Sequence, residues 1–323
     1  KIMAKTNSLV LKRRATKTVV NFFRFLFLLG MCYLFLFPIF YMFSVAIADP
    51  SVANDPLSIW IPSKVSLYPF KIAVEVLDYY KSLFLTSRIA VFSTVFTLLS
   101  CSLAGYGISR FDFLGKRLVL IIVFLTIIVP PQVLLTSQYI NFRYFDFGGL
   151  MKLLKPIIGT DSLYLLDSSW TFILPAMFAN GLRGGLFIYI FKQFFDGLPK
   201  ELEEAGRIDG CGTFGIFWKI MLPQAVPAIV TVLLFSFVWH WNDYYSSSVF
   251  FTSGTKPLQV MLNGFSVALS QGGYTIGGVE ITKYEERMFT MAGALLTVLP
   301  PLIIYVIAQR KFTESVERSG IVG

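Results

Sequence analysis

The stretch from residue 198 to residue 223 combines acidic, small and turn-forming residues in a short space. Its acidic side chains, Glu201, Glu203 and Glu204, fall in the first turns of a predicted helix, where the helix dipole favours negative charge. The whole chain holds one histidine, His240, and neither a metal-ligand cluster nor a spaced Ser/His/Asp arrangement. Catalysis is therefore the weakest interpretation. The residue types of this stretch suit contact with another protein instead.

Turn-forming residues divide the same stretch into two parts. Asp209-Gly210 is a turn signal, because glycine adopts positive φ without strain. Pro199 suits the first turn of the helix before it, and Thr213 can cap a second short helix that Pro223 ends. The pattern predicts a compact helix–turn–helix with three exposed small residues that let another backbone approach: Ala205, Gly206 and Gly210. Composition alone favours a plainer interpretation, a solvated amphipathic connector.

A second group of polar and aromatic residues lies inside long apolar segments. Its members are Arg88, Asn180, Arg183, Trp239, His240, Asn242, Asp243 and Tyr244. A charge at the centre of a bilayer costs at least about 2.5–3.5 kcal/mol, so such residues usually face a protein interior or a water-filled cavity. Arg183 is flanked by glycines, which favour close packing or a helix break. It is either a cation that lines a path and meets hydroxyls or a carboxylate of a solute, or the structural partner of Asp243.

Other members of this group also have two interpretations each. Arg88 lies in the outer turn of its segment, where extension of the side chain to the membrane interface is favoured over a binding role. His240 is able to change charge near neutral pH, although a packed histidine is preferred. Trp239 and Tyr244 either stack on a solute or belong to the aromatic belt of the membrane.

Six apolar segments must position these residues: 20–48, 82–108, 118–140, 170–195, 224–251 and 287–309. Each reaches the roughly 20 residues that a transmembrane helix needs, and none alternates with a period of two. Hydrophobic residues make up 55% of the chain and charged residues 15%, whereas soluble domains have about 25% charged residues. The composition excludes a disordered protein, a nucleic-acid-binding tail and a disulfide scaffold. It predicts an all-α protein with six transmembrane helices.

Basic residues indicate the orientation of these segments. The tail up to Arg24 contains no acidic residue and seven basic ones: Lys1, Lys5, Lys12, Arg13, Arg14, Lys17 and Arg24. Because cytoplasmic loops are enriched in Lys and Arg, both termini are predicted to be cytoplasmic. The first segment also imitates the core of a signal peptide, but it is longer than the usual core of about 7–15 residues. The longer outer loops are then 49–81, 141–169 and 252–286.

Two proline pairs lie inside the apolar segments. Pro130-Pro131 and Pro300-Pro301 are expected to break the helical hydrogen bonding, which is tolerated where neighbouring groups or a cavity satisfy the freed carbonyls. The breaks are either hinges for a conformational change or static kinks.

The stretch from 198 to 223 resembles the EAA loop of binding-protein-dependent ABC importer permeases. The family pattern is Glu-Ala-Ala, two residues, Asp-Gly-Ala, eight residues and Ile-x-Leu-Pro. The present chain keeps this spacing throughout, with Glu204-Ala205-Gly206, Asp209-Gly210-Cys211 and Ile220-Met221-Leu222-Pro223. Gly206 and Cys211 replace the usual alanines, and both are small.

Other stretches are similar to the carbohydrate-uptake, MalG-like branch of this family. They are residues 102–111, Trp241-Asn242-Asp243-Tyr244 and the Gly-ended tail 320–323. The resemblance covers about residues 20–323, is weakest at 143–168, and implies the type I ABC importer permease fold. The implied organisation is a cytoplasmic basic tail (1–18), a first transmembrane helix (19–48), a periplasmic loop (49–81), a five-helix core (82–309) containing the cytoplasmic coupling loop 196–223, and a cytoplasmic tail (310–323).

The family resemblance also implies partners and roles. Two permease subunits, here expected to be a heterodimer, form the path, two ATPase subunits dock beneath it, and a periplasmic binding protein delivers the solute. The implied ATPase-coupling residues are Glu204, Ala205, Gly206, Asp209, Gly210, Ile220, Leu222 and Pro223. ATP and Mg²⁺ are expected on the partner ATPases and no cofactor on this chain, which lacks the Gly-x-x-x-x-Gly-Lys-Ser/Thr loop. The implied location is the lipid bilayer of the bacterial inner membrane, with no nucleic-acid partner.

The solute implied by this branch is an oligosaccharide. An acidic one, such as an alginate oligosaccharide, is an open alternative that no residue motif fixes. A stand-alone ion-coupled secondary transporter also remains an alternative, since Arg183, Asp243 and His240 could form an ion relay inside the membrane. The hydropathy pattern shows no inverted repeat, which counts against that alternative.

Overall fold

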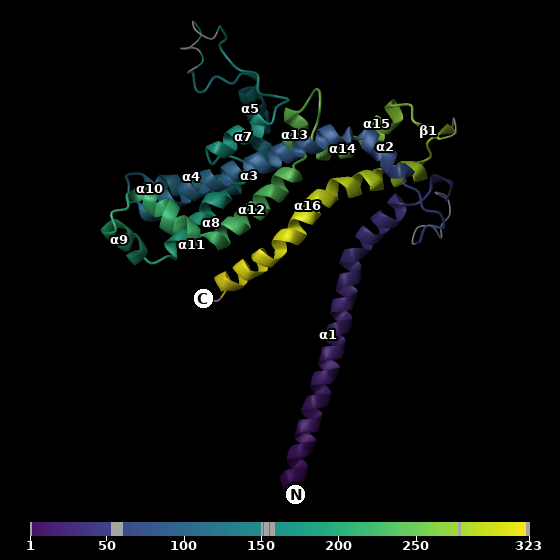
Figure 1. Ribbon diagram of the computed structural model, residues 1–323, viewed down its shortest axis with the longest axis horizontal. Coiled ribbons are helices and arrows are strands. Elements are labelled where there is room, and N and C mark those ends of the chain that lie inside the picture. Colours follow the sequence, from purple (N-terminus) through teal and green to yellow (C-terminus); the bar gives the residue numbers. More distant parts are fainter. Residues whose placement is uncertain are drawn as a thin grey trace. The chain divides into compact units, whose positions relative to one another are not determined.

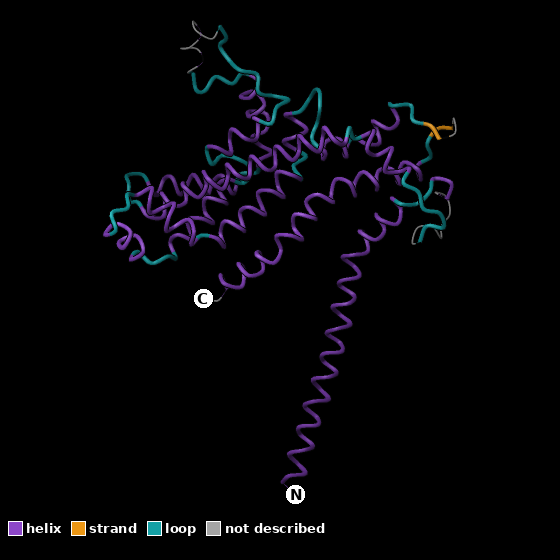
Figure 2. Tube along the Cα trace, in the orientation of Figure 1, coloured by secondary structure: helices purple, strands orange, loops and turns teal. Residues whose placement is uncertain are grey.

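The computed structural model describes residues 2–52, 61–149, 151, 155, 159–276 and 279–320. The Gly-ended tail beyond residue 320 and parts of the predicted outer loops lie outside these ranges. Helices dominate, and the strands of the described residues are β1 (Thr275–Ile276) and β2 (Val279–Glu280), an antiparallel pair (Figure 2). The chain divides into two compact units: Lys1–Ala73 with Gly273–Leu295, and Val74–Gly272 with Leu296–Gly323.

The first unit contains few elements. They are α1 (Ile2–Ala46), the short 3-10 helix η1 (Pro50–Val52), most of α2 (Tyr68–Val76), the two strands and the first part of α16 (Lys283–Gly320). Within this unit the ring centroids of Tyr68 and Phe289 are 6.1 Å apart, and Arg287 donates a 3.4 Å hydrogen bond to the hydroxyl of Tyr41. None of the candidate functional residues lies in this unit, so the second unit positions all of them.

The second unit holds the remaining helices (Figure 1). They are α3 (Tyr79–Arg110), α4 (Lys116–Ile128), α5 (Pro131–Arg143), α7 (Trp170–Met177), α8 (Gly184–Asp196), α9 (Glu201–Ile208), α10 (Thr213–Ile216), the π-helical η3 (Phe217–Met221), α11 (Leu222–Gln224), α12 (Val226–Trp241), α13 (Tyr245–Phe250), α14 (Leu258–Asn263) and α15 (Phe265–Gln271). The long helix α3 packs against α7, α8 and α12 and forms the centre of the unit.

The contact between α3 and α8 forms the core of this unit. Phe187, Phe191 and Phe195 recur every four residues, so they share one face of α8, and all three are fully buried. Gly105 of α3 faces them so closely that an added Cβ atom would lie 2.6 Å from the Cβ of Phe191. Between membrane helices the lipid is as apolar as the side chains, so close backbone approach at small residues stabilises the pair through van der Waals contact.

Three of the described helices are long and apolar enough to cross a membrane: Thr16–Ala46, Tyr79–Arg110 and Lys283–Ile307. Two bent helix pairs qualify if each is one span: Lys116–Ile128 with Pro131–Arg143, bent by 102°, and Thr213–Gln224 with Val226–Trp241, bent by 79°. The described residues therefore hold three to five candidate spans. Neither the predicted number of six nor the predicted orientation of the termini is confirmed.

The segment 170–195, predicted as one span, is divided into α7 and α8. Ala179 and Arg183 lie in the break with φ of 57° and 58°, a left-handed conformation that cannot continue a right-handed helix. Pro175 lies inside the last turns of α7. The helix break predicted at the glycines is thus confirmed, but α7 with 8 residues and α8 with 13 residues are each too short to span alone.

The two proline pairs behave differently. α4 ends at Ile128 and α5 begins at Pro131, so the break predicted at Pro130-Pro131 is confirmed. Pro300-Pro301 lies inside the uninterrupted helix α16, and the break predicted there is wrong. A helix interior tolerates prolines where other groups satisfy the freed carbonyls. The same Pro-Pro dipeptide is therefore able to end a helix at one position and to lie inside a helix at another.

Candidate functional site

The predicted coupling loop forms a helix–turn–helix, the hairpin α9–α11, at one end of the second unit (Figure 1). α9 ends in a Schellman motif, in which the N–H of Cys211 donates to the carbonyl of Gly206 at 2.9 Å and the N–H of Gly210 donates to that of Arg207 at 3.1 Å. Gly210 has φ of 80°, which glycine adopts without strain. The turn predicted at Asp209-Gly210 is therefore confirmed.

Three details of the hairpin differ from the prediction. Pro199 precedes α9 instead of lying in its first turn. Thr213 is the first residue of α10, and the capping position before it is held by Gly212, so no side chain caps this helix. Pro223 lies in α11 instead of ending a helix, because the π-helical turn η3 places it at a helix start, where its missing N–H costs little.

Gly206 is buried inside the hairpin. A Cβ atom added to it would lie 2.6 Å from Cδ1 of Ile220 and 3.2 Å from Cγ1 of Ile216. The absence of a side chain therefore lets α9 lie directly on the second half of the hairpin. The prediction that Gly206 offers itself to another protein is wrong, since this position serves packing within the hairpin.

The outward surface of the hairpin carries acidic and apolar side chains together. Its exposed candidates are Glu204, Ala205, Asp209, Gly210 and Pro223, while Ile220 and Leu222 are half-buried. Beside them, Ile208 is 87% exposed and Phe214 is 73% exposed. A contiguous apolar patch with a polar rim is typical of an interaction surface, and Ile208 and Phe214 are the apolar side chains that such a patch would use here. Sequence reasoning missed both, although the charged residues on either side of Ile208 were a signal that it lies on the exposed face.

Several of the predicted path residues meet at a cavity of about 280 Å³. The candidates that line it are Arg183, Trp239, Asn242, Asp243 and Tyr244. Cζ of Arg183 lies 5.6 Å from the centroid of the Trp239 ring, which is the geometry of a cation–π interaction. Arg183 and Asn180 also line a second cavity of about 290 Å³, so this arginine borders both.

Arg183 and Asp243 do not form an ion pair, although the structure describes both residues. The carboxylate of Asp243 instead accepts hydrogen bonds from the hydroxyl of Ser246 at 3.1 Å and the N–H of Ser247 at 2.8 Å, at the start of α13. Asn242 donates to the carbonyl of Val238 at 3.0 Å, which fixes its side chain. Among the residues that the structure describes, the guanidinium of Arg183 is therefore stacked on an aromatic ring and pairs with no carboxylate.

The two remaining candidates lie elsewhere. His240 is buried with its Nδ1 2.8 Å from the carbonyl oxygen of Ser236 and its ring next to Phe172, so it is a packed histidine, as preferred from the sequence. Arg88 borders a separate cavity of about 630 Å³ together with Tyr80 and Asp167. The structure brings neither residue to the cavities bordered by Arg183.

Residues 97–318 match the family model described as "Binding-protein-dependent transport system inner membrane component". The match covers more than half of the chain. The chain belongs to this family. Membership makes the protein a transport component of a membrane and not an enzyme, as the sequence predicted, and agrees with its long apolar helices.

Curated relatives extend over most of this permease. The polygalacturonan/rhamnogalacturonan transport system permease protein YtcP of Bacillus subtilis (strain 168) is 29% identical over 300 residues, which are 92% of this chain and 96% of that protein. The arabinooligosaccharides transport system permease protein AraQ of the same organism is 27% identical over 245 residues, 76% of this chain and 74% of that protein.

The fold also matches a solved transporter. A chain from the crystal structure of a bacterial ABC transporter involved in the import of the acidic polysaccharide alginate superposes with a TM-score of 0.70, at 22% identity, over 92% of this chain and 98% of that chain. The likeness shows that this protein has the predicted type I ABC importer permease fold.

Proposed function

We propose that this protein is a permease subunit of an ATP-driven ABC importer for an oligosaccharide, and that it forms half of the translocation path in the bacterial inner membrane. The family match supports the transport role. The names of the relatives, which refer to polygalacturonan or rhamnogalacturonan and to arabinooligosaccharides, support a sugar polymer or oligosaccharide as the solute class. A periplasmic binding protein would deliver this solute.

The hairpin α9–α11 is the proposed contact with the ATPase. The observation that carries this role is an exposed acidic and apolar surface on a hairpin held in one conformation by Gly210 and Gly206. Glu204 and Asp209 would contact polar groups of the ATPase, and Ile208 would fill an apolar depression on it. Two ATPases would hold the ATP and Mg²⁺, one beneath this chain and one beneath a second, different permease subunit.

The cavities bordered by Arg183 are the proposed contribution to the path. An arginine that is stacked on Trp239 and unpaired with any carboxylate in the part of the chain that the structure describes suits a passing carboxylate, and the aromatic ring suits the apolar face of a sugar. We therefore propose that the oligosaccharide is acidic, with an alginate oligosaccharide as one possible member of that class. The likeness to the alginate importer agrees with this choice at the level of the fold.

The proposed function is tested by extracting the tagged protein from its native membranes with mild detergents and identifying the proteins that co-purify. The proposal expects an ATPase with a phosphate-binding loop and a second permease. A clean monomer or homo-oligomer in several mild detergents would contradict it. Uptake by the purified chain alone, driven by an ion gradient, would establish the secondary transporter instead.

A further inference from the structure

A buried ion pair connects the hairpin to the central helix α3. Nε of Arg110, the last residue of α3, lies 3.1 Å from Oε1 of Glu203 in α9. The side chains are only 6% and 7% exposed. The two atoms are within ion-pair distance but are not aligned as a hydrogen bond, so attraction between the charges holds them together.

Arg110 also binds the segment that leads into α9. Its Nη2 donates a 2.7 Å hydrogen bond to the carbonyl oxygen of Leu198. The planar guanidinium presents several donors in a fixed arrangement, so one arginine holds the carboxylate and the carbonyl at the same time. The end of α3 is thereby attached to α9 and to the residues immediately before it.

A second polar contact beside this pair connects α3 to α8. The hydroxyl of Ser109 donates to Oδ1 of Asp196 at 2.6 Å, and Lys192 pairs with the same carboxylate. The last turn of α3 therefore has polar contacts both with the end of α8 and with the start of the hairpin. Because α3 packs along α8 and α12, a displacement of its end acts on helices that border the cavities of Arg183.

The burial of the Arg110–Glu203 pair distinguishes it from the other ion pairs of the described residues. In each of those, at least one side chain is 38% or more exposed. Removing water from two charges is unfavourable, so a buried pair persists only while each charge is compensated. Oε2 of Glu203 has one further partner, Nη2 of Arg207 at 3.5 Å, whose side chain is 63% exposed. Removing Arg110 therefore leaves the buried carboxylate with this more distant, exposed partner alone. A buried pair is thus a contact with one favoured geometry, whereas exposed pairs adopt many at little cost.

We propose that Arg110 and Glu203 are positioning residues that transmit the displacement of α9 to α3, so that closure of the ATPases moves the transmembrane helices. This inference rests on the proposed coupling role of the hairpin. The most extensive packing of α9 is on η3 and α10, within its own hairpin. Loss of the pair would let the hairpin follow the ATPase while α3 lags behind it.

The test uses the assembled complex in proteoliposomes and measures solute transported per ATP hydrolysed. Arg110→Ala, Glu203→Ala and the double variant are compared with the wild type. Each single variant is expected to lower this ratio about tenfold, in the range of known coupling free energies, while ATP hydrolysis continues. Because both residues act through one contact, the double variant should be no worse than the more impaired single variant.

Lys116→Ala is the matched control, since it breaks the exposed Lys116–Asp112 pair of the neighbouring turn, and its ratio should equal that of the wild type. Arg110→Gln and Glu203→Gln each remove the charge and keep much of the side-chain length if the alanine variants fail to assemble. An unchanged ratio in these variants, additive effects in the double variant, or failure of both conservative variants to assemble would overturn the inference. A wild-type preparation without an ATPase would instead overturn the proposed function.

Discussion

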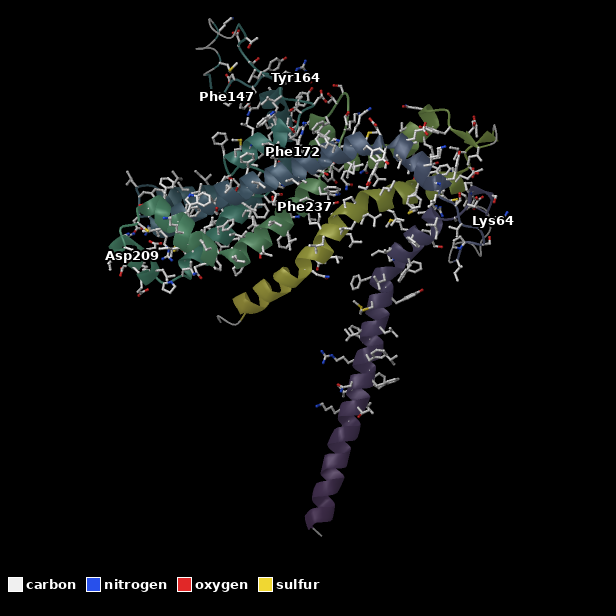
Figure 3. The ribbon with its side chains drawn as sticks, viewed as in Figure 1. Lys64, Phe147, Tyr164, Phe172, Asp209 and Phe237 are labelled. Atoms are coloured by element: carbon white, nitrogen blue, oxygen red, sulfur yellow. The ribbon has the colours of Figure 1, made fainter. Side chains whose placement is uncertain are left out.

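The hairpin α9–α11 and the cavities around Arg183 belong to the same unit, but their charged side chains differ in how they are paired. In the hairpin region, Glu203 is paired with Arg110 and the polar groups of the turn bond to one another. At the cavities, Arg183 forms no ion pair with a carboxylate of the described ranges, has positive φ and lies over an aromatic ring. Figure 3 shows Asp209 of the hairpin well away from Phe172, which borders the second cavity.

This difference corresponds to two tasks. A region that transmits force needs one geometry, which buried charge pairs and close glycine contacts provide. A region that admits a solute needs polar groups whose partner is not yet present, held in place by packing and backbone conformation. Substitutions in the two regions should therefore fail differently, the first in coupling and the second in solute recognition.

The largest loss of stability is expected from a substitution at Gly105, in the α3–α8 contact to which both regions are connected. In Gly105→Ala the new Cβ would lie 2.6 Å from Cβ of Phe191 and 2.9 Å from the backbone nitrogen of Lys192, neither of which can give way cheaply. We expect the free energy of unfolding to fall by about 1–3 kcal/mol, measured by thermal unfolding. We also expect much less assembled complex, measured by size-exclusion chromatography. Gly107→Ala is the control, because an added Cβ there meets nothing within 4 Å. Equal stability of the two variants would contradict the close α3–α8 packing.

The next effect tests the hairpin alone. Gly210→Val places a branched side chain at φ of 80°, where an added Cβ meets nothing within 4 Å, so we expect the main cost to be local backbone strain of about 1–2 kcal/mol. The protein should remain in the membrane, while uptake falls at least about fivefold. Gly212→Ala, at φ of −70°, should transport like the wild type. Normal uptake by Gly210→Val would count strongly against the coupling role of the turn.

A smaller effect is expected at the cavity. Arg183→Gln keeps most of the length of the side chain but removes the charge and the cation–π contact, which is worth about 0.5–2 kcal/mol. Uptake of an acidic oligosaccharide should fall about three- to tenfold, uptake of a neutral one much less, and ATP hydrolysis per solute should stay unchanged. Arg117→Gln removes an exposed cation from the first turn of α4 and controls for net charge. Equal losses for neutral and acidic solutes would remove the argument for an acidic substrate.

The features that could be predicted from the sequence are those encoded by neighbouring residues. The Asp209-Gly210 turn and the break beside Arg183 depend on local backbone preferences. The exposure of Ile208 had a local signal in its charged neighbours, which was overlooked. The burial of Gly206 depends on how α9 folds back onto Ile216 and Ile220, and the Arg110–Glu203 pair on the meeting of α3 and α9, so no local pattern could reveal either of them. The same holds for the prolines, since the packing around each pair decides whether the helix is interrupted.

The smallest expected effect is the pH dependence of stability that Asp167 contributes. Unlike the guanidinium of Arg183, the carboxylate of Asp167 has several hydrogen-bond partners. Partial burial raises the pKa of Asp167, but hydrogen bonds from Ser253, Thr252 and Tyr164 outweigh it and hold the pKa below its ordinary value of 3.8. Since the unfolded state then binds more protons, this contribution to stability is present above pH 3.8 and is lost as the pH falls through the lowered value.

Thermal unfolding of the wild type and Asp167→Asn should therefore differ at neutral pH and converge in acid. If the difference in unfolding temperature persisted unchanged to the lowest accessible pH, the charge of Asp167 would not be what holds its loop to Thr252 and Ser253.

The most direct test of the central claim is to place a photo-crosslinking amino acid at Ile208, which is 87% exposed on the hairpin, in cells that produce the whole transporter. The same probe at Ile128, 73% exposed at the end of α4, is the control. The account predicts that the probe at position 208 captures an ATPase subunit, more strongly when nucleotide and loaded binding protein are present, and that the control does not. Capture of lipid or of another copy of this chain at position 208, with no ATPase, would contradict it.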